Sequence, residues 1–174
     1  MAQWYMLTLV GEDAPGIVAK VTAALFEGGC NLGEASMVRL GGNFTIMLMV
    51  QHPGTGHSLE ALVSPVADSL GLHMHVDRID GELHHHVEPD VHIIVYGADR
   101  AGIVASVTGA LAEAGLNITD LESDVGGTPD APIYIMHMEG VARESVAALE
   151  SALDVLAREQ GVEVKLSPID TMVG

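Results

Sequence analysis

The chain has 174 residues, 48% of them hydrophobic, which is enough for one medium domain or for two small domains with modest cores. Seven Lys and Arg against 24 Asp and Glu give a formal net charge of −17, which leaves no basic stripe for nucleic-acid phosphates. No apolar run reaches the ~18 residues of a membrane span, and the first residues carry no basic region or cleavage signature. We therefore expect a cytoplasmic protein that contacts neither nucleic acid nor membrane directly.

The single cysteine, Cys30, excludes an internal disulfide and fits a reducing compartment. We expect it to be a small buried apolar residue. The acidic balance is typical of a solvated surface and argues against anionic macromolecular partners.

The first predicted element is a central strand over residues 4–10, because this stretch is apolar and β-rich, and Gly11 is expected to end it. A helix over residues 14–27 follows, since its apolar residues recur at i, i+4 and i+8. Asp13 stands at the N-cap position of this helix, and Pro15 fits its first turn.

Two glycines, Gly28 and Gly29, end the first predicted helix. Strands over residues 31–40 and 43–50 then form a hairpin through Gly41 and Gly42.

Leucines and valines at helical spacing predict a second helix over residues 57–70, and residues 72–79 predict a closing strand. The order of elements is therefore βαββαβ, which is the ferredoxin-like split βαβ arrangement.

An internal repeat sets the organisation of the whole chain. At an offset of 86 residues, the segment 11–31 aligns with 97–117 without a gap, and 13 of the 21 positions are identical. The polar segment between the copies, rich in histidine, is typical of a linker. We expect a first domain over residues 1–82, a linker over 83–90 and a second domain over 91–174.

The second copy repeats the first in order. It predicts a central strand over residues 91–96 ended by Gly97, a helix with Asp99 at its N-cap, a second helix over 142–160 and a final strand over 162–166. The fold class is therefore α+β, with two βαββαβ domains whose antiparallel sheets each carry helices on one face.

Both copies contain the string G-x-D-x-x-G-I-V, then a helix, then G-x-N and a hydrophobic residue. This pattern resembles the ACT regulatory domain. The resemblance implies that a small ligand, an amino acid, binds at interfaces between ACT units and that a protein partner, such as a transcription activator, responds. The implied ligand-binding residues are Asp13, Ala14, Pro15, Gly16, Ile17, Val18, Asn31, Leu32, Asp99, Arg100, Ala101, Gly102, Ile103, Val104, Asn117 and Ile118.

The head of each first helix suits an amino-acid carboxylate, because free backbone N–H groups meet there at the positive end of the helix dipole. Gly16 and Gly102 either admit a ligand or serve tight packing between helix and strand. The two aspartates before these glycines are expected to cap their helices, with ligand contact as an additional role.

The remaining polar candidates each have two interpretations. Asn31 and Asn117 either bond a ligand in a neighbouring unit or satisfy turn backbone. Arg100 either pairs with a carboxylate or is a solvated arginine at a helix start. Serine-sensing ACT domains carry a ligand-contacting histidine where this chain has Gly11 and Gly97, so serine is not a safe assignment.

Histidines form a rival signal, because six of the nine fall between His73 and His92. His73 and His75 share one strand face, and with linker histidines they offer donors for a metal ion. Exposed linker histidines without a metal are the alternative. The candidate metal ligands are His73, His75, His84, His85 and His86.

Catalytic motifs are missing from the sequence: it has no nucleophile elbow, no P-loop and no dinucleotide fingerprint. We expect a non-catalytic regulator that needs no cofactor and forms a homodimer, since two small cores leave sheet edges to cover. The alternatives are a ligand-free interaction module and a metal-handling protein.

Overall fold

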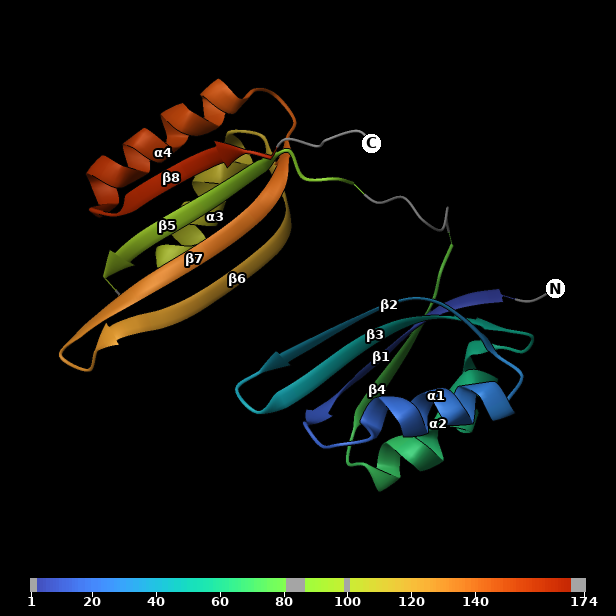
Figure 1. Ribbon diagram of the computed structural model, residues 1–174. Helices are drawn as coiled ribbons and strands as arrows, with labels where there is room; N and C mark the ends of the chain where they lie inside the picture. Colours follow the sequence, from blue (N-terminus) through green and yellow to red (C-terminus); the bar gives the residue numbers. More distant parts are fainter. Residues whose placement is uncertain (1–2, 81–86, 99–100, 170–174) are drawn as a thin grey trace. The chain divides into compact units, whose positions relative to one another are not determined.

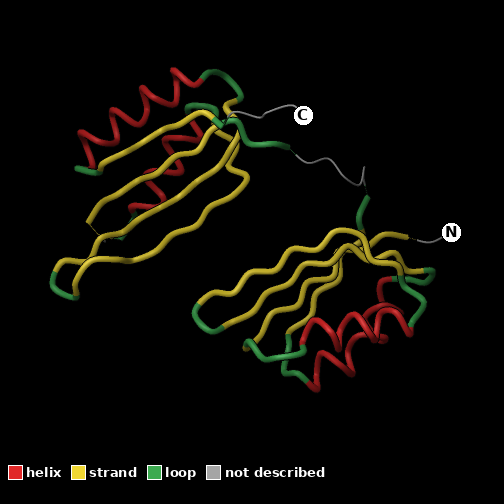
Figure 2. Tube along the Cα trace, viewed as in Figure 1, coloured by secondary structure: helices red, strands yellow, loops and turns green. Residues whose placement is uncertain are grey.

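The computed structural model describes residues 3–80, 87–98 and 101–169. The chain divides into two compact units, residues 1–83 and 84–174. Each unit is a four-stranded antiparallel sheet with two helices on one face (Figure 1, Figure 2). The predicted fold class is confirmed.

The first unit follows the predicted order of elements. They are β1 (Gln3–Glu12), α1 (Ile17–Glu27), β2 (Asn31–Leu40), β3 (Asn43–His52), α2 (Gly56–Ser69) and β4 (His73–Arg78). The strand order is β2-β3-β1-β4, so β1 is an inner strand as predicted. Gly41 and Gly42 join β2 to β3 with φ of 56° and 79°, which is the backbone that a tight hairpin turn requires.

The second unit has the same topology. Its elements are β5 (Val91–Ala98), α3 (Ile103–Glu113), β6 (Leu116–Thr128), β7 (Ala131–Ala142), α4 (Val146–Gln160) and β8 (Glu163–Pro168). The strand order is β6-β7-β5-β8.

Each unit has its own hydrophobic core between the sheet and its helices. Alternate residues of β1 and every fourth residue of α1 are fully buried there, because these periods place side chains on one face of a strand and of a helix. Burying one such aliphatic side chain stabilises the unit by about 1.5–3 kcal/mol.

Two glycines expected to end strands lie inside them instead. β1 continues through Gly11 and β5 through Gly97. A Cβ at Gly11 would lie 2.6 Å from Cδ2 of Leu72, and a Cβ at Gly97 would lie 2.7 Å from Cγ1 of Val162. These glycines therefore admit the segment that leads into the last strand of each unit, and the prediction that they end their strands is wrong.

Two predicted helix starts are also corrected. α1 begins at Ile17 because Gly16, at φ 86°, has a left-handed backbone that no helix continues through. α4 begins at Val146 because the Ser145 hydroxyl accepts from the Ala148 N–H, while Ala142 still pairs with β6.

Candidate functional site

The turns before α1 and α3 carry most of the predicted ligand residues. Gly16 and Gly102 are the N-caps, with φ of 86° and 84° and no side-chain cap. The prediction that Asp13 caps α1 is wrong: its carboxylate pairs with Arg39 at 2.5 Å, and its N–H donates to the Gly42 carbonyl at 3.0 Å. Asp99 and Arg100, the corresponding residues before α3, lie outside the described residues.

Both of these turns are open within their own units. A Cβ placed on Gly16 or Gly102 would meet no atom within 4 Å, so tight packing is not the reason for glycine at either position. The left-handed backbone is the reason, because only glycine adopts it without strain. Ala14, Pro15 and Ala101 beside them are exposed.

The structure separates the two halves of the predicted site within one unit. Asn31 follows the end of α1, and eleven helical residues, about 16 Å, separate it from the turn at Gly16. The Asn31 amide donates to Gln51 at 3.2 Å, and Asn117 accepts from Arg143 at 3.5 Å. A single unit therefore does not assemble both halves around one ligand.

The apolar members of the predicted site divide between core and surface. Ile17 and Ile103 are buried in the two cores, so their side chains are unavailable to a ligand. Val18 and Leu32 are 40% and 43% exposed, whereas Val104 and Ile118 are half-buried.

Three of the pockets are lined wholly by described residues, and none of the sixteen predicted ligand residues lines any of these three. One, of about 410 Å³, lies at the end of β5, where the chain leaves for α3; it is lined by Tyr96, Gly97, Ile133, Gly161 and Glu163. A smaller one, of about 340 Å³, lies between α3 and α4.

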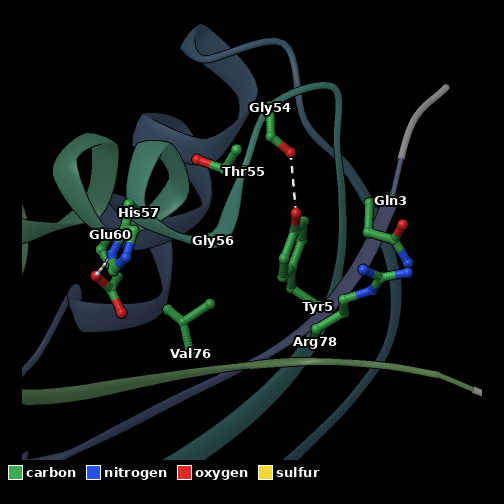
Figure 3. A pocket seen from close by; sticks show the side chains of 9 residues that line it. All are labelled: Gln3, Tyr5, Gly54, Thr55, Gly56, His57, Glu60, Val76 and Arg78. Atoms are coloured by element: carbon green, nitrogen blue, oxygen red, sulfur yellow. Dashed lines mark hydrogen bonds and ion pairs between the residues drawn. The ribbon is translucent and has the colours of Figure 1, made fainter.

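The third pocket, of about 450 Å³, lies at the head of α2 in the first unit (Figure 3). It combines one aromatic ring, two ionisable groups on α2, one arginine on β4 and a glycine-rich loop, and is lined by Gln3, Tyr5, Gly54, Thr55, Gly56, His57, Glu60, Val76 and Arg78. The Tyr5 hydroxyl donates to the Gly54 carbonyl at 2.9 Å and so ties the loop to β1.

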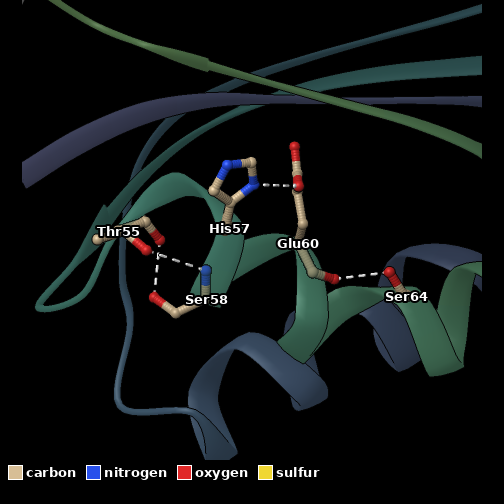
Figure 4. Close-up of polar contacts among 5 residues, drawn as sticks. All are labelled: Thr55, His57, Ser58, Glu60 and Ser64. Carbon is tan, nitrogen blue, oxygen red and sulfur yellow. Dashed lines mark hydrogen bonds and ion pairs between the residues drawn. The ribbon is translucent and has the colours of Figure 1, made fainter.

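A chain of polar side chains supports this loop from behind. The Cys30 Sγ lies 3.3 Å from Nδ1 of His52, and Nε2 of His52 lies 2.8 Å from Oγ of Ser58. Ser58 donates to the Thr55 carbonyl at 2.7 Å, and Thr55 caps α2 by accepting from the Ser58 N–H (Figure 4).

The direction of this hydrogen-bond chain follows from its last member. Because Ser58 donates to Thr55, it accepts from Nε2–H of His52, and Nδ1 is left to accept from the Cys30 thiol. Cys30 and His52 are both buried, and burial raises the pKa of the Cys30 thiol above its ordinary value. Cys30 is buried in the core as predicted, and its thiol also takes part in a hydrogen bond that the sequence did not indicate.

Sequence reasoning overlooked His52, although a signal for it was present. β3 alternates, and its inward positions are Phe, Ile, Leu and Val until His52, which is the only buried polar or charged residue among those described. A polar residue on the core face of a strand needs hydrogen-bond partners, and this requirement points to a built polar cluster.

The histidine candidates for a metal ion are only partly described. His73 and His75 lie on one face of β4, and Nε2 of His75 pairs with Asp77 at 3.0 Å. In the described part of the chain, no group of three His, Cys, Asp or Glu residues is arranged to hold a metal ion. His84, His85 and His86 lie outside that part.

Family models described as ACT domain match residues 4–77 and residues 91–158. The chain belongs to the ACT-domain family, with one ACT domain in each unit. Among the described residues, no helix is both long and apolar enough to cross a membrane.

Relatives that are similar to this chain in sequence include small proteins and an enzyme. The UPF0237 protein YjhC of Lactococcus lactis is 39% identical over 74 residues, which are 42% of this chain and 85% of the relative. Phosphoserine phosphatase SerB2 of Mycobacterium tuberculosis is 27% identical over 165 residues; these are 91% of this chain but 39% of the enzyme.

Among the solved structures that match nearly the whole chain, two have TM-scores above 0.7. An unknown protein from Galdieria sulphuraria has a TM-score of 0.78 at 25% identity, over 97% of this chain and 99% of that one. A candidate glycine cleavage system transcriptional repressor has a TM-score of 0.71 at 19% identity, over 97% and 98%. At that identity, the second likeness shows the shared fold.

Proposed function

We propose that the chain is a cytoplasmic, non-catalytic regulator that binds an amino acid where ACT units meet and passes the signal to a protein partner. The regulated process in this proposal is transcription of genes of amino-acid metabolism, the kind of role that the repressor's name gives. The strong negative charge supports a protein partner over direct contact with DNA.

The observation that carries the proposal is the pair of open turns at Gly16 and Gly102. Each begins an eleven-residue helix, so backbone N–H groups without intrahelical partners meet the positive end of a helix dipole at an accessible place. Asn31 and Asn117 lie at the opposite ends of these helices, and a site that uses both kinds of residue needs a second unit to complete it.

A homodimer is part of the proposal. The sheet face of the first unit that points away from its helices exposes several large apolar side chains: Val10 is 40% exposed, Val38 59%, Leu40 75% and Met47 44%. Such a patch is typical of an interaction surface. Light scattering on the purified chain is expected to give twice the monomer mass, and a stable monomer at micromolar concentration would count against this part.

Thermal denaturation of the full chain with each proteinogenic L-amino acid tests the ligand-binding role. A ligand present at about 100 times its dissociation constant adds about 2.7 kcal/mol to the free energy of unfolding. We expect at least one amino acid to raise the melting temperature and Asn31→Ala or Asn117→Ala to diminish the rise. If no amino acid changes the melting temperature, the chain is a ligand-free interaction module instead.

A further inference from the structure

The geometry points to a ligand site of its own in the first unit: the pocket at the head of α2 takes a small molecule that carries both a carboxylate and an amino group. This site is separate from the turns at Gly16 and Gly102, none of whose residues line it.

The lining of the pocket supplies both signs of charge. Arg78 on β4 offers a guanidinium, which recognises carboxylates through paired N–H donors, and Glu60 on α2 offers a carboxylate for an ammonium group. In Figure 3 these side chains come from opposite sides of the pocket, with Tyr5 and Val76 between them. Arg78 is oriented by Asp80, whose carboxylate accepts from its Nε at 2.8 Å, while Glu60 contacts His57 at 3.2 Å.

The loop that forms one wall is fixed on both of its faces. Tyr5 holds the Gly54 carbonyl, and the Cys30–His52–Ser58 chain holds the Thr55 carbonyl. A Cβ at Gly54 would lie 2.2 Å from Oγ of Ser58 and 2.7 Å from Nε2 of His52. Glycine at this position therefore leaves room for the Ser58 and His52 side chains. A wall held in this way is preorganised for binding.

The second unit shows that the fold itself needs none of this polar chain. By strand register and helix caps, the places of Cys30, His52 and Ser58 are taken by Leu116, Ala142 and Ala148. The same sheet and helices therefore form around an apolar cluster. Burying a histidine in place of an apolar side chain brings a desolvation cost. The topology does not require this cost, because the second unit has the same topology without the histidine.

The lining differs between the units in the same way. Tyr5 pairs with Arg78, whereas Val91 at the equivalent position pairs with Pro168. After the capping residues Thr55 and Ser145, the first unit has Gly56 and the second has Val146. The aromatic ring, the guanidinium and the open loop are thus all particular to the first unit, which assigns the ligand to that unit.

The size of the pocket agrees with such a ligand. About 450 Å³ lies within the ~300–1,000 Å³ range of small-molecule sites, and the carboxylate and amino group of a free amino acid match its two charged sides.

Amide NMR spectra of the full chain, titrated with each proteinogenic L-amino acid, test this site. We expect the Gly54 and Gly56 amides to shift on addition of a binding amino acid. Arg78→Gln is expected to weaken binding of that amino acid about tenfold or more. The same substitution should have little effect on binding of the amino acid amide, because the amide lacks the carboxylate. Glu60→Gln is expected to weaken binding of the amino acid. It should leave binding of the N-acetyl derivative unchanged, because that derivative lacks the ammonium group that Glu60 would contact.

Matched controls share the change in charge. Arg158→Gln and Glu150→Gln alter exposed residues of α4, the second at the position equivalent to Glu60, and are expected to bind as the wild type does. Shifts confined to Gly16 and Gly102 would overturn this site and leave the proposed function standing. Shifts confined to Gly54 and Gly56 would do the reverse, and the absence of any shift would overturn both.

Discussion

At the scale of single residues, Gly16 and Gly102 set the shape of the turns on which the proposed function depends. Alanine at either position meets no clash, but it must adopt φ near 85°. We expect each Gly→Ala change to lower the free energy of unfolding by about 1 kcal/mol, since the left-handed backbone costs an L-residue about 1–2 kcal/mol and unfolded-state entropy offsets part of this.

Gly109 gives the matched control in chemical denaturation. It lies exposed inside α3, without a positive φ and with open space around its Cα, so Gly109→Ala is expected to stabilise the second unit by about 0.5–1 kcal/mol. Stabilisation by Gly102→Ala as well would contradict the strained-turn account.

Cys30 predicts a pH dependence of stability. Its pKa in the folded chain is raised by burial above the ordinary value of 9.0, so the unfolded chain releases the thiol proton first as pH rises. The stabilisation is complete below about pH 9 and is lost as pH rises through the folded pKa.

Cys30→Leu, which installs the second unit's residue, removes this contribution. Urea denaturation at neutral and alkaline pH should show a steeper loss of stability for the wild type than for the variant. Equal slopes would mean that the thiol is not desolvated as the structure shows.

At the scale of elements, α2 contains a proline that its counterpart α4 does not. Pro65 lies exposed in the helix interior, where proline removes a hydrogen bond and costs about 3 kcal/mol relative to alanine. Pro65→Ala is therefore expected to raise the free energy of unfolding of the first unit by about 1–3 kcal/mol. Val155→Ala, at the equivalent position of α4, is expected to change stability by less than about 0.5 kcal/mol.

The elements were predictable from the sequence where periodicity decides them. The apolar, β-rich composition of residues 4–10 predicted a strand and the four-residue spacing in α1 predicted a helix, both of the right kind, and Gly41 and Gly42 predicted the hairpin. Helix starts were missed because an aspartate and a proline read as capping signals, while the backbone angle of Gly16 decides the actual start.

The polar chain was missed for a different reason. Cys30, His52 and Ser58 are separated along the sequence, and only the antiparallel register of β2 with β3 and the first turn of α2 bring them together. The loops chosen for ligand binding came from the repeat, whereas the aromatic ring, the guanidinium and the open loop at the head of α2 lie where the two copies differ. Comparing the copies for their differences would have indicated the head of α2.

At the scale of the whole molecule, we propose that residues 1–82 and 91–174 are independent folding domains joined by the linker 83–90. Each unit has a complete core, so fragments 1–83 and 84–174 are expected to unfold cooperatively on their own. Trp4, the only tryptophan, reports on the first fragment by fluorescence, and circular dichroism reports on the second.

Equivalent core positions provide matched variants of the two fragments. Leu48 pairs with Leu7 in the first sheet, as Met138 pairs with Ile93 in the second. Leu48→Ala and Met138→Ala should each destabilise their own fragment by about 2–5 kcal/mol. A fragment that shows no cooperative transition would contradict its independence.

We propose that the chain uses its two similar units to sense a free amino acid. Calorimetric titration of the full-length chain with each proteinogenic L-amino acid tests this most directly. We predict that at least one of them gives a heat of binding that saturates as the amino acid is added. Titrations that give only heats of dilution for every amino acid would contradict it.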